Sequence, residues 1–353
     1  MTAAGSYTVR RPERADLERL KAFAQDIWPG SPADKLTRRW WWNDPRAPQC
    51  WIAVHNDSGD IAAMCGERRS VLVLEAMEVP VASICDWDVS PRHKGKGLGR
   101  MLVERSRADH PVMYTTSISE AAATAFTRLG WAGHRPLSVM VGCPPLVSAV
   151  ARARARRDSI ATRNYRISSG SDDGIRHLDA IWDSSRQDRP IMTTRDARAL
   201  KAHLRLVPHR SYGLTVAFSG DTPVGYALYR TLPKGSFRRF GHTPVGLLAD
   251  FWVPEQNGTV LTRLVQDVSW ALARSGVPVM LALTTQSWAR SALRPLGFAS
   301  EDTPWLGAKL RSFASRAMHV SDYALPDFED GWHVTFVDND MDLIFGSLAE
   351  LPT

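Results

Sequence analysis

Long apolar runs and cysteine pairs are missing from this sequence. Nowhere do about 18 apolar residues follow one another, which predicts that no helix spans a membrane. Residues 1–20 contain no apolar core of signal-peptide length. The four cysteines, Cys50, Cys65, Cys85 and Cys143, form no CxxC pair. We therefore expect free, mostly buried thiols in a reducing compartment, and a cytoplasmic protein without a membrane partner.

Several catalytic signatures are missing as well. The histidines show no HExxH or paired spacing, so no metal is indicated. The absence of GxSxG gives no support to serine-hydrolase chemistry. The net charge is +7, from 44 basic against 37 acidic residues, without a long basic tract. This balance favours an anionic partner; nucleic acid is unsupported, whereas one anionic small molecule in a basic pocket fits the sequence well.

What the sequence does contain is a concentration of glycine and basic residues at 84–104, ICDWDVSPRHKGKGLGRMLVE, between a predicted strand and a predicted helix. Gly95, Gly97 and Gly99 stand on alternate positions, where glycine is costly unless something approaches the backbone closely. A helix that begins directly after such a loop offers unpaired N–H groups and the positive end of its dipole to an anion. The pattern matches neither GxxxxGKS/T nor the dinucleotide fingerprint, and a plain glycine turn is the alternative.

The order of predicted elements is that of an α/β protein with a mixed sheet. Strands are expected at residues 50–54, 60–74, 79–89 and 112–117, and helices at 97–110 and 119–131. A length of 353 residues suggests two domains. The same order recurs in the second half, where Asp250–Val253 aligns with Asp86–Val89, so the halves are predicted to be two copies of one fold.

The boundaries between the copies follow from a change in composition. An Arg-rich segment separates them, for which an interdomain linker is the favoured interpretation and a phosphate-binding arm the alternative. We predict a first domain at 1–145, a linker at 146–163 and a second domain with a tail at 164–353. Where the first copy has glycines and bases, the second has Glu255–Gly258. An anion site is therefore expected in the first copy only.

The glycine loop and its surroundings resemble the GCN5-related N-acetyltransferase (GNAT) family. Residues 89–99 are similar to the family's pyrophosphate-binding motif, Arg/Gln-x-x-Gly-x-Gly/Ala after a strand that ends in Val-x-Pro. The following helix resembles the family's next motif, with Ala122, Phe126, Gly130 and Trp131 at its small, aromatic and Gly-Phe positions. The resemblance implies two GNAT-like domains, each a mixed, mostly antiparallel sheet flanked by helices, with the family's wedge between splayed strands used in the first.

The second copy resembles the same fold with its donor site eroded. Ala289, Leu293, Gly297 and Phe298 keep the closing helix, but nothing like the glycine loop precedes it. By analogy with tandem members of the family, the second domain is expected to brace the first or to shape the acceptor site.

The donor that the resemblance implies is acetyl-CoA or another acyl-CoA, used as a co-substrate without a metal. Its diphosphate would lie on the amides of residues 93–98, and its pantetheine arm in a wedge between residues 87–89 and 113–116. The residues expected to bind the donor are Trp87, Val89, Arg92, His93, Lys94, Gly95, Lys96, Gly97, Leu98 and Gly99.

An amine acceptor must lose a proton to attack the acyl group, which calls for a base. Asp86 and Asp88 share one face on a regular strand, and Asp86 is the preferred base with Asp88 second. A structural role is the alternative, because Asp250 recurs at the equivalent place in the second copy. The tyrosine that many family members use as the acid is replaced by Phe126, so the acid is unassigned; Tyr114 could substitute for it or could belong to the core.

Two groups of residues, one aromatic and one acidic, are candidates for the acceptor site. Trp40, Trp41 and Trp42 lie where the family shapes its acceptor pocket, and at least one is expected to be exposed for stacking on a sugar or ring, with core packing as the alternative. Asp338, Asp340 and Asp342 in the tail are expected to form a solvated turn, with attraction of an ammonium-bearing acceptor as the alternative.

We therefore predict an N-acyltransferase that moves an acyl group, in the first instance acetyl, from acyl-CoA to the amine of a small molecule in a ternary complex. Family analogy favours an amino sugar, nucleotide-linked ones included. One alternative donor is an acyl group on a carrier protein, since the basic loop could hold its single phosphate. A non-catalytic CoA-binding or scaffold protein is the other alternative. The sequence gives no prediction of oligomeric state.

Overall fold

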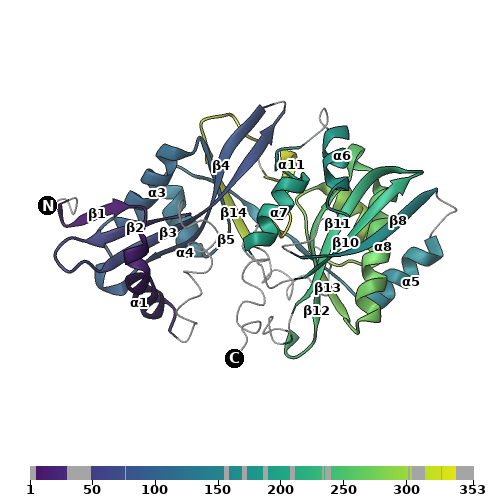
Figure 1. Cartoon of the computed structure of the whole chain (residues 1–353), viewed down its shortest axis with the longest axis horizontal. Coiled ribbons are helices and arrows are strands. Elements are labelled where there is room, and N and C mark those ends of the chain that lie inside the picture. Colours follow the sequence, from purple (N-terminus) through teal and green to yellow (C-terminus); the bar gives the residue numbers. More distant parts are fainter. Residues whose placement is uncertain are drawn as a thin grey trace. The chain divides into compact units, whose positions relative to one another are not determined.

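The computed structural model describes residues 5–29, 49–75, 77–154, 159–168, 173–185, 190–206, 211–232, 234, 240–300, 303, 315–326 and 328–338. It divides the chain into two compact units (Figure 1). The first contains Met1–Val71, Val79–Gly133 and Met318–Leu325, and the second contains Leu72–Glu78, His134–Ala317 and Pro326–Thr353. Each unit therefore includes segments that are distant in the sequence.

The first unit is built on a mixed sheet with the strand order β1-β2-β3-β4-β5-β14, which β6 continues. The strands are β1 (Tyr7–Arg10), β2 (Cys50–His55), β3 (Ile61–Leu74), β4 (Met77–Val89), β5 (Val112–Ile118), β14 (Ser315–Ser321) and β6 (Ala132–Leu137). The pairs β1–β2 and β2–β3 are antiparallel, and β4 and β5 are parallel. A parallel pair needs a crossover connection, which α3 (Leu98–Asp109) provides.

Helices cover both faces of this sheet. Trp51 and Ala53 of β2 pack with Leu102 of α3 on one face. Ile52 of the same strand packs with Phe23 of α1 (Leu17–Ile27) on the other face. Successive strand residues point to opposite faces, so an unbroken apolar run such as CWIAV is stable only where both faces are buried.

The helix α4 (Glu120–Arg128) shows how local sequence signals place an aromatic side chain in this core. The Ser119 hydroxyl accepts a backbone N–H of the first turn. After the last turn Gly130 adopts φ +81°, and the Trp131 amide donates to the Phe126 carbonyl at 3.1 Å. This closure directs Trp131 back onto the core beside Phe126.

The second unit repeats the arrangement with the strand order β7-β13-β12-β11-β10-β8. The strands of this sheet are β7 (Val139–Gly142), β8 (Ile160–Ile167), β10 (Tyr212–Ser219), β11 (Thr222–Leu232), β12 (Val245–Trp252) and β13 (Val279–Leu283). The short strand β9 (Met192–Thr193) pairs with β3 instead. The helices of this unit are α5 (Pro144–Arg154), α6 (His177–Ser184), α7 (Ala197–Leu206), α8 (Gly258–Arg274), α9 (Ser287–Leu293) and α11 (Phe328–Gly331). The parallel pair β12–β13 corresponds to β4–β5, with α8 as its crossover helix.

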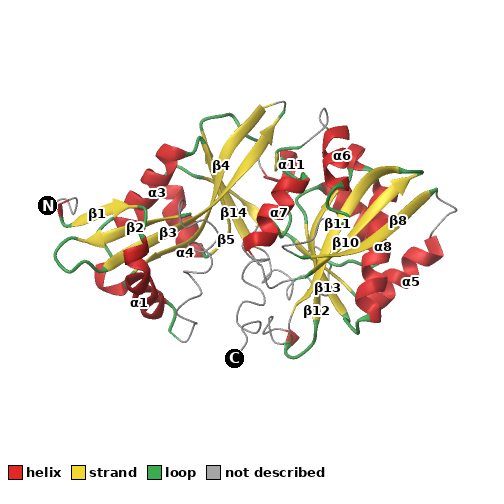
Figure 2. Ribbon diagram, viewed as in Figure 1, coloured by secondary structure: helices red, strands yellow, loops and turns green. Residues whose placement is uncertain are grey.

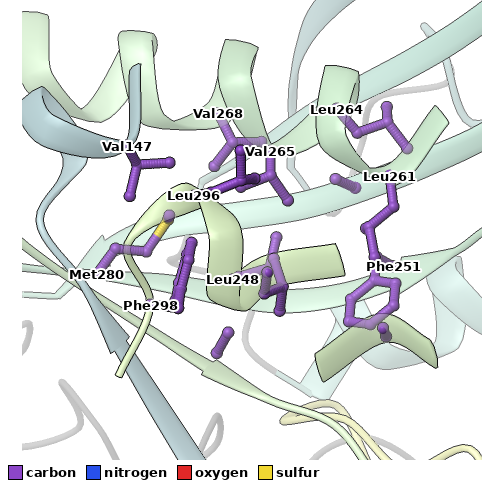
Figure 3. Close-up of a cluster of buried hydrophobic side chains, with 14 of the residues drawn as sticks. Val147, Leu248, Phe251, Leu261, Leu264, Val265, Val268, Met280, Leu296 and Phe298 are labelled. Carbon is purple, nitrogen blue, oxygen red and sulfur yellow. The ribbon is translucent and has the colours of Figure 1, made fainter. Parts of the chain in front are cut away.

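The core of the second unit lies between α8 and its sheet. Val265 and Val268 of α8 point toward Leu248 of β12 in Figure 3, which also places Val147 of α5 in this cluster. Ala151 of α5 is buried in the same core. The first part of the predicted linker is thus a helix that packs into the second unit.

The two mixed sheets with their flanking helices confirm the predicted fold class (Figure 2). The agreement follows from local patterns, because the helices carry an amphipathic apolar period and the buried strands carry short apolar runs. Within the described ranges, no helix combines the length and the apolar character that crossing a membrane requires.

Candidate functional site

At Asp86 the strand β4 departs from regular geometry, with φ +44°, which we interpret as a bulge. The effect is visible in the packing: Ile84, Trp87 and Val89 all lie in or against the core under α3. On a regular strand Ile84 and Trp87 would point to opposite faces, since three residues separate them. The expectation that Asp86 and Asp88 share a face because their strand is regular is therefore wrong in its premise.

The parallel strands β4 and β5 part just before this bulge. Their pairing runs from Val81↔Val112 to Ile84↔Thr115, although β4 continues to Val89 and β5 to Ile118. The Thr115 hydroxyl donates to the Ile84 carbonyl at 2.9 Å where the pairing ends. The predicted wedge includes Met113, Tyr114 and Thr115 on the β5 side of the gap. In the structure these three residues pair with β4, so the gap opens beyond them.

The buried state of Tyr114 follows from this pairing. Tyr114 is paired with Ser83 and its side chain is 2% exposed. Its burial supports the alternative of a core tyrosine, because almost none of its surface is accessible to solvent. Phe126, which replaces the family's usual tyrosine acid, is 1% exposed and lies between Trp87 and Trp131, with ring centroids at 4.5 and 4.4 Å.

The glycine loop leaves the start of α3 open. Gly95 and Gly97 adopt φ +77° and +76°, a region that favours glycine, and a Cβ on either would meet no atom within 4 Å. Gly97 is the N-cap residue, and no side chain caps the helix. The first N–H groups of α3 therefore have no side-chain acceptor, which is the arrangement that binds anions at helix N-termini.

Basic side chains surround this open helix end. Arg92, Lys94 and Lys96 are exposed on the loop. The side chain of Leu98, the first residue of α3, is buried, so Leu98 can contact an anion only through its backbone N–H. The loop also contacts two residues outside every motif in the sequence, Asp26 and Tyr7. Asp26 of α1 accepts a hydrogen bond from Ser90, and the Tyr7 hydroxyl lies 3.0 Å from Nδ1 of His93.

Gly99 serves packing rather than ligand access. A Cβ at this position would lie 2.9 Å from the Trp87 ring, and the Trp87 Nε1–H donates to the Gly99 carbonyl at 3.1 Å. The indole of Trp87 thus fixes the first turn of α3 against the bulged end of β4. Of the residues predicted to bind the donor, Trp87 and Gly99 have this structural contact.

The two aspartates of the bulge interact through their charges. Asp86, Asp88 and the neighbouring Val89 are all half-buried. Burial, together with the negative charge of Asp86, raises the pKa of Asp88 to about 6, and the Lys94 ammonium opposes both effects. A carboxylate with this pKa is largely ionised at pH 7 and still basic enough to take up a proton, which suits a general base.

The corresponding aspartate of the second unit is buried in an ion cluster. Asp250 is 3% exposed. It pairs with Arg195 at 3.0 Å and accepts hydrogen bonds from Tyr226 at 2.6 Å and Thr335 at 2.7 Å. Arg195 also pairs with Asp338. This cluster gives Asp250 a structural role, and Arg195 carried no sequence signal that could have identified it.

The segment 332–338 covers the place where β12 and β13 part, after Leu248↔Ala282. The Val337 amide donates to the Ala249 carbonyl at 3.0 Å, and His333 donates through Nε2 to the Phe251 carbonyl at 2.9 Å. Beyond β13, the Val334 amide donates to the Thr285 hydroxyl at 3.1 Å. All seven residues of the segment are buried.

This burial corrects the prediction for the tail. Asp338 is 2% exposed and ion-paired, so the expectation of a solvated turn is wrong for this residue. Asp340 and Asp342 lie outside the described residues, as do the three tryptophans predicted to shape the acceptor pocket, Trp40, Trp41 and Trp42. In the part of the chain that the structure describes, no three His, Cys, Asp or Glu side chains gather as a metal site would require.

The helix that corresponds to α3 is closed at its start. The Asn257 side chain accepts the N–H groups of Thr259 and Val260 at 3.1 and 3.2 Å at the beginning of α8. The preceding turn holds Glu255 and Gln256 at positive φ without a glycine. In the second unit the chain itself therefore occupies both the helix end and the space between the parted strands.

Comparisons with known proteins agree with this geometry. Residues 16–131 match the Acetyltransferase (GNAT) family, whereas no curated protein sequence matches the chain. A GCN5-related N-acetyltransferase from Kribbella flavida is similar, with a TM-score of 0.58 and 13% identity over 90% of this chain and 72% of that one.

Two further solved structures are similar over most of the chain. One is the glucosamine N-acetyltransferase region of a fungal multi-domain β-N-acetylglucosaminidase, with a TM-score of 0.55 and 15% identity over 89% of this chain and 38% of that one. The other is Saccharomyces cerevisiae N-myristoyltransferase with bound myristoyl-CoA, with a TM-score of 0.51 and 9% identity over 92% and 83%. At these identities the likeness establishes the fold.

Proposed function

Because residues 16–131 form a GNAT-family acetyltransferase domain, we propose that the chain is an N-acyltransferase that moves an acetyl or other acyl group from acyl-CoA to the amine of a small molecule. The observation that carries the proposal is the start of α3, which has an uncapped N-terminus, two glycines at positive φ and open space above them. Along the chain, this helix end follows β4, whose pairing with β5 stops at Ile84.

The donor diphosphate would bind to the amides of residues 94–98, because the His93 amide, included in the range predicted from the sequence, donates to the Ser90 carbonyl. Gly95 and Gly97 let its oxygens approach the backbone, and Lys94, Lys96 and Arg92 supply opposite charge. The second unit would bind no donor, because Asn257 and the segment 332–338 take the equivalent places. One acyl-CoA for each chain is the expected stoichiometry.

The pantetheine arm would lie in the gap between residues 86–89 and 116–118. Backbone N–H groups that border such a gap can donate to the thioester carbonyl and stabilise the oxyanion that forms during attack. The amine nitrogen forms a bond to the carbonyl carbon, the carbon–sulfur bond breaks, and CoA leaves as the thiolate. The positive φ at Asp86 supports this role, since it lies just after the last pair between β4 and β5, Ile84↔Thr115.

The proton of the attacking amine would pass to Asp88, directly or through one water, with Asp86 as the neighbour that keeps Asp88 basic. The raised pKa of Asp88 supports this assignment, whereas the sequence alone placed Asp86 first. Phe126 has no proton to give, so the thiolate would leave without a side-chain acid or would take a proton from water. Tyr114 is paired and buried and has no part in this scheme.

For the acceptor we propose an amino sugar. The support is the likeness to the fungal glucosamine N-acetyltransferase region, at 15% identity, and it is a likeness of fold. A ring stacked on one of Trp40, Trp41 or Trp42 would suit such an acceptor. The carboxylates of Asp86 and Asp88 would also attract the ammonium form of the amine before it is deprotonated.

The test is release of CoA thiol from acetyl-CoA against a panel of amines that includes glucosamine, with the acetylated product identified by mass spectrometry. Cys143 is exposed, so a reaction without amine must be subtracted when a thiol reagent is used. Calorimetry with CoA measures binding separately. Binding without turnover on any amine would identify a non-catalytic CoA-binding protein. No binding of CoA, combined with turnover of an acylated carrier protein, would identify the carrier as the donor.

A further inference from the structure

Ser90 is the point at which the glycine loop is fastened to the rest of the first unit. Its amide donates to the Ala62 carbonyl of β3 at 2.9 Å, and its carbonyl accepts the His93 amide at 2.9 Å. Its hydroxyl donates to Oδ2 of Asp26 at 2.8 Å, and Ser90 is only 1% exposed. Asp26 lies in the last turn of α1, far from the loop in sequence.

A carboxylate beside an anion site needs a reason, because its charge opposes that of the ligand. The distance from Oδ2 of Asp26 to the Arg92 guanidinium is 3.8 Å, so this basic group compensates part of the charge. The hydrogen bond from Ser90 supplies the remaining reason, since without Asp26 a buried hydroxyl would lose its acceptor. Position rather than charge is therefore the contribution of Asp26.

A second contact fastens the loop from β1. The Tyr7 hydroxyl lies 3.0 Å from Nδ1 of His93, and their rings meet edge to face with centroids at 5.7 Å. Tyr7 is 8% exposed, and the His55 ring lies 5.2 Å from Tyr7 and 5.5 Å from His93. The three rings form a packed cluster that fixes the short helical turn at Pro91–His93.

We propose that Asp26 and Tyr7 are positioning residues for the acyl-CoA diphosphate: they hold Ser90 and His93, and thereby the loop amides, in the binding geometry before the donor arrives. This inference rests on the proposed function of the loop. Gly95 and Gly97 give the loop a larger conformational freedom than other residues would, and ordering it on binding would weaken affinity. Fixing its first turn from outside reduces that loss.

The second unit is consistent with this role. There the chain runs from Val253 directly to Pro254, so it has no counterpart of Ser90 between the strand and the turn. Its helix α8 is capped by Asn257 and holds no anion in the proposed scheme. A unit without a donor has no need of an anchored loop.

The experiment compares Asp26→Ala, Asp26→Asn, Ser90→Ala and Tyr7→Phe in the full-length chain, with Glu18→Gln as the control. Glu18 lies on the same helix as Asp26, and Glu18→Gln changes only the charge in its ion pair with Lys21. Asp26→Ala, Ser90→Ala and Tyr7→Phe are expected to raise the KM for acetyl-CoA and the Kd for CoA about 3- to 10-fold, with kcat about unchanged. Asp26→Asn should stay near wild type, because its amide oxygen still accepts from Ser90.

The double variant Asp26→Ala/Ser90→Ala should be no weaker than either single variant, since both remove the same bond. Wild-type KM and Kd for Asp26→Ala and Tyr7→Phe, or an equal loss for Asp26→Asn and Asp26→Ala, would overturn the proposal. If no amine yields thiol, the proposed reaction fails, but the Kd for CoA still decides whether the anchors matter. If the wild-type chain binds no CoA, both proposals fail.

Discussion

At the scale of single residues, the proposed chemistry depends on Asp88 and its neighbour Asp86. The half-buried position of Asp88 holds its pKa near 6, and the bulge at Asp86 brings a second carboxylate close enough to contribute. A carboxylic acid that resists ionisation is a compromise, because the folded chain is less stable whenever that group is charged. Both effects can be measured.

Asp88→Asn should lower kcat about 100-fold, because it removes the proposed base. It should also stabilise the chain at pH 7.5 by about 1–2 kcal/mol, since the folded pKa of Asp88 lies above the ordinary value near 3.8. The penalty on the charged form is present above pH 6 and disappears below about pH 4. Thermal unfolding of both proteins at pH 7.5 and pH 4 tests this, and equal differences at the two pH values would contradict it.

Asp86→Asn removes the charge that helps to raise the pKa of Asp88. The acid limb of the kcat/KM profile should therefore move to lower pH, by about 0.5–1 unit, while kcat at pH 8 changes little. Comparison with the wild type on the same acceptor cancels the titration of the acceptor amine. A collapse of kcat at all pH values would instead make Asp86 the base.

At the scale of elements, α3 and α8 occupy equivalent positions in their units, but their N-termini are capped differently. α3 begins at Gly97 without a side-chain cap, whereas α8 begins at Asn257, which accepts two of its N–H groups. A side-chain cap satisfies the groups that an anion would otherwise bind. The beginning of the helix, rather than the helix itself, thus separates a donor site from a structural copy.

Gly97→Asp should weaken CoA binding about 100-fold or more, because a carboxylate would occupy the anion site. A non-glycine residue at positive φ also costs stability, about 1–2 kcal/mol. Gly276→Asp is the matched control: Gly276 has φ +71°, meets nothing within 4 Å and follows α8. Calorimetry with CoA should show normal binding for Gly276→Asp, and equal losses in both variants would remove the donor site from this loop.

The segment 332–338 is the other element that distinguishes the units. Arg195 is the cation that pairs with both Asp250 and Asp338. Arg195→Met should leave two buried carboxylates without this cation and destabilise the second unit by about 3–5 kcal/mol. Amide hydrogen exchange should show the loss of protection in this segment. Arg263→Met, which removes a partly exposed pair with Asp267 at 3.9 Å, should cost about 0.5 kcal/mol or less. Equal effects would mean that the buried cluster does not hold the segment.

At the scale of the whole molecule, the chain returns to its first unit from far along the sequence. The strand β14 lies next to β5 in the first sheet, and Met318 of β14 is buried in the same core as Trp131. The Asp322 amide donates to the Pro111 carbonyl at 2.9 Å. An edge of the parallel pair is covered in this way by residues that no N-terminal fragment contains.

A truncated chain of residues 1–150 should therefore not fold to an active form, because the edge of β5 and the pocket of Met318 would be exposed. Circular dichroism and acyl-CoA turnover would measure this. Joining residues 315–326 to the truncated chain by a flexible linker should restore cooperative unfolding of the first unit. Full activity of residues 1–150 without that strand would contradict the dependence on β14.

Local sequence signals were sufficient for the fold class and for the position of the glycine loop. These signals are the apolar period, helix caps such as Ser119 and glycines in turns. Each depends on a few neighbouring residues, so it can be recognised from a short stretch of sequence. The absence of an equivalent loop at Glu255–Gly258 was equally local. These signals are the part of the protein that its sequence determined by itself.

The tertiary structure decided what distant residues do to each other. Asp26 anchors Ser90, and Arg195 pairs with Asp250 beside the C-terminal segment; both contacts join positions that are far apart in the chain. The positive φ of Asp86 was likewise not evident from the sequence. A sequence records no partner for a lone aspartate, and the same residue type is half-buried and basic in one unit and ion-paired in the other. Burial and charge, which set those two fates, exist only once the chain has folded.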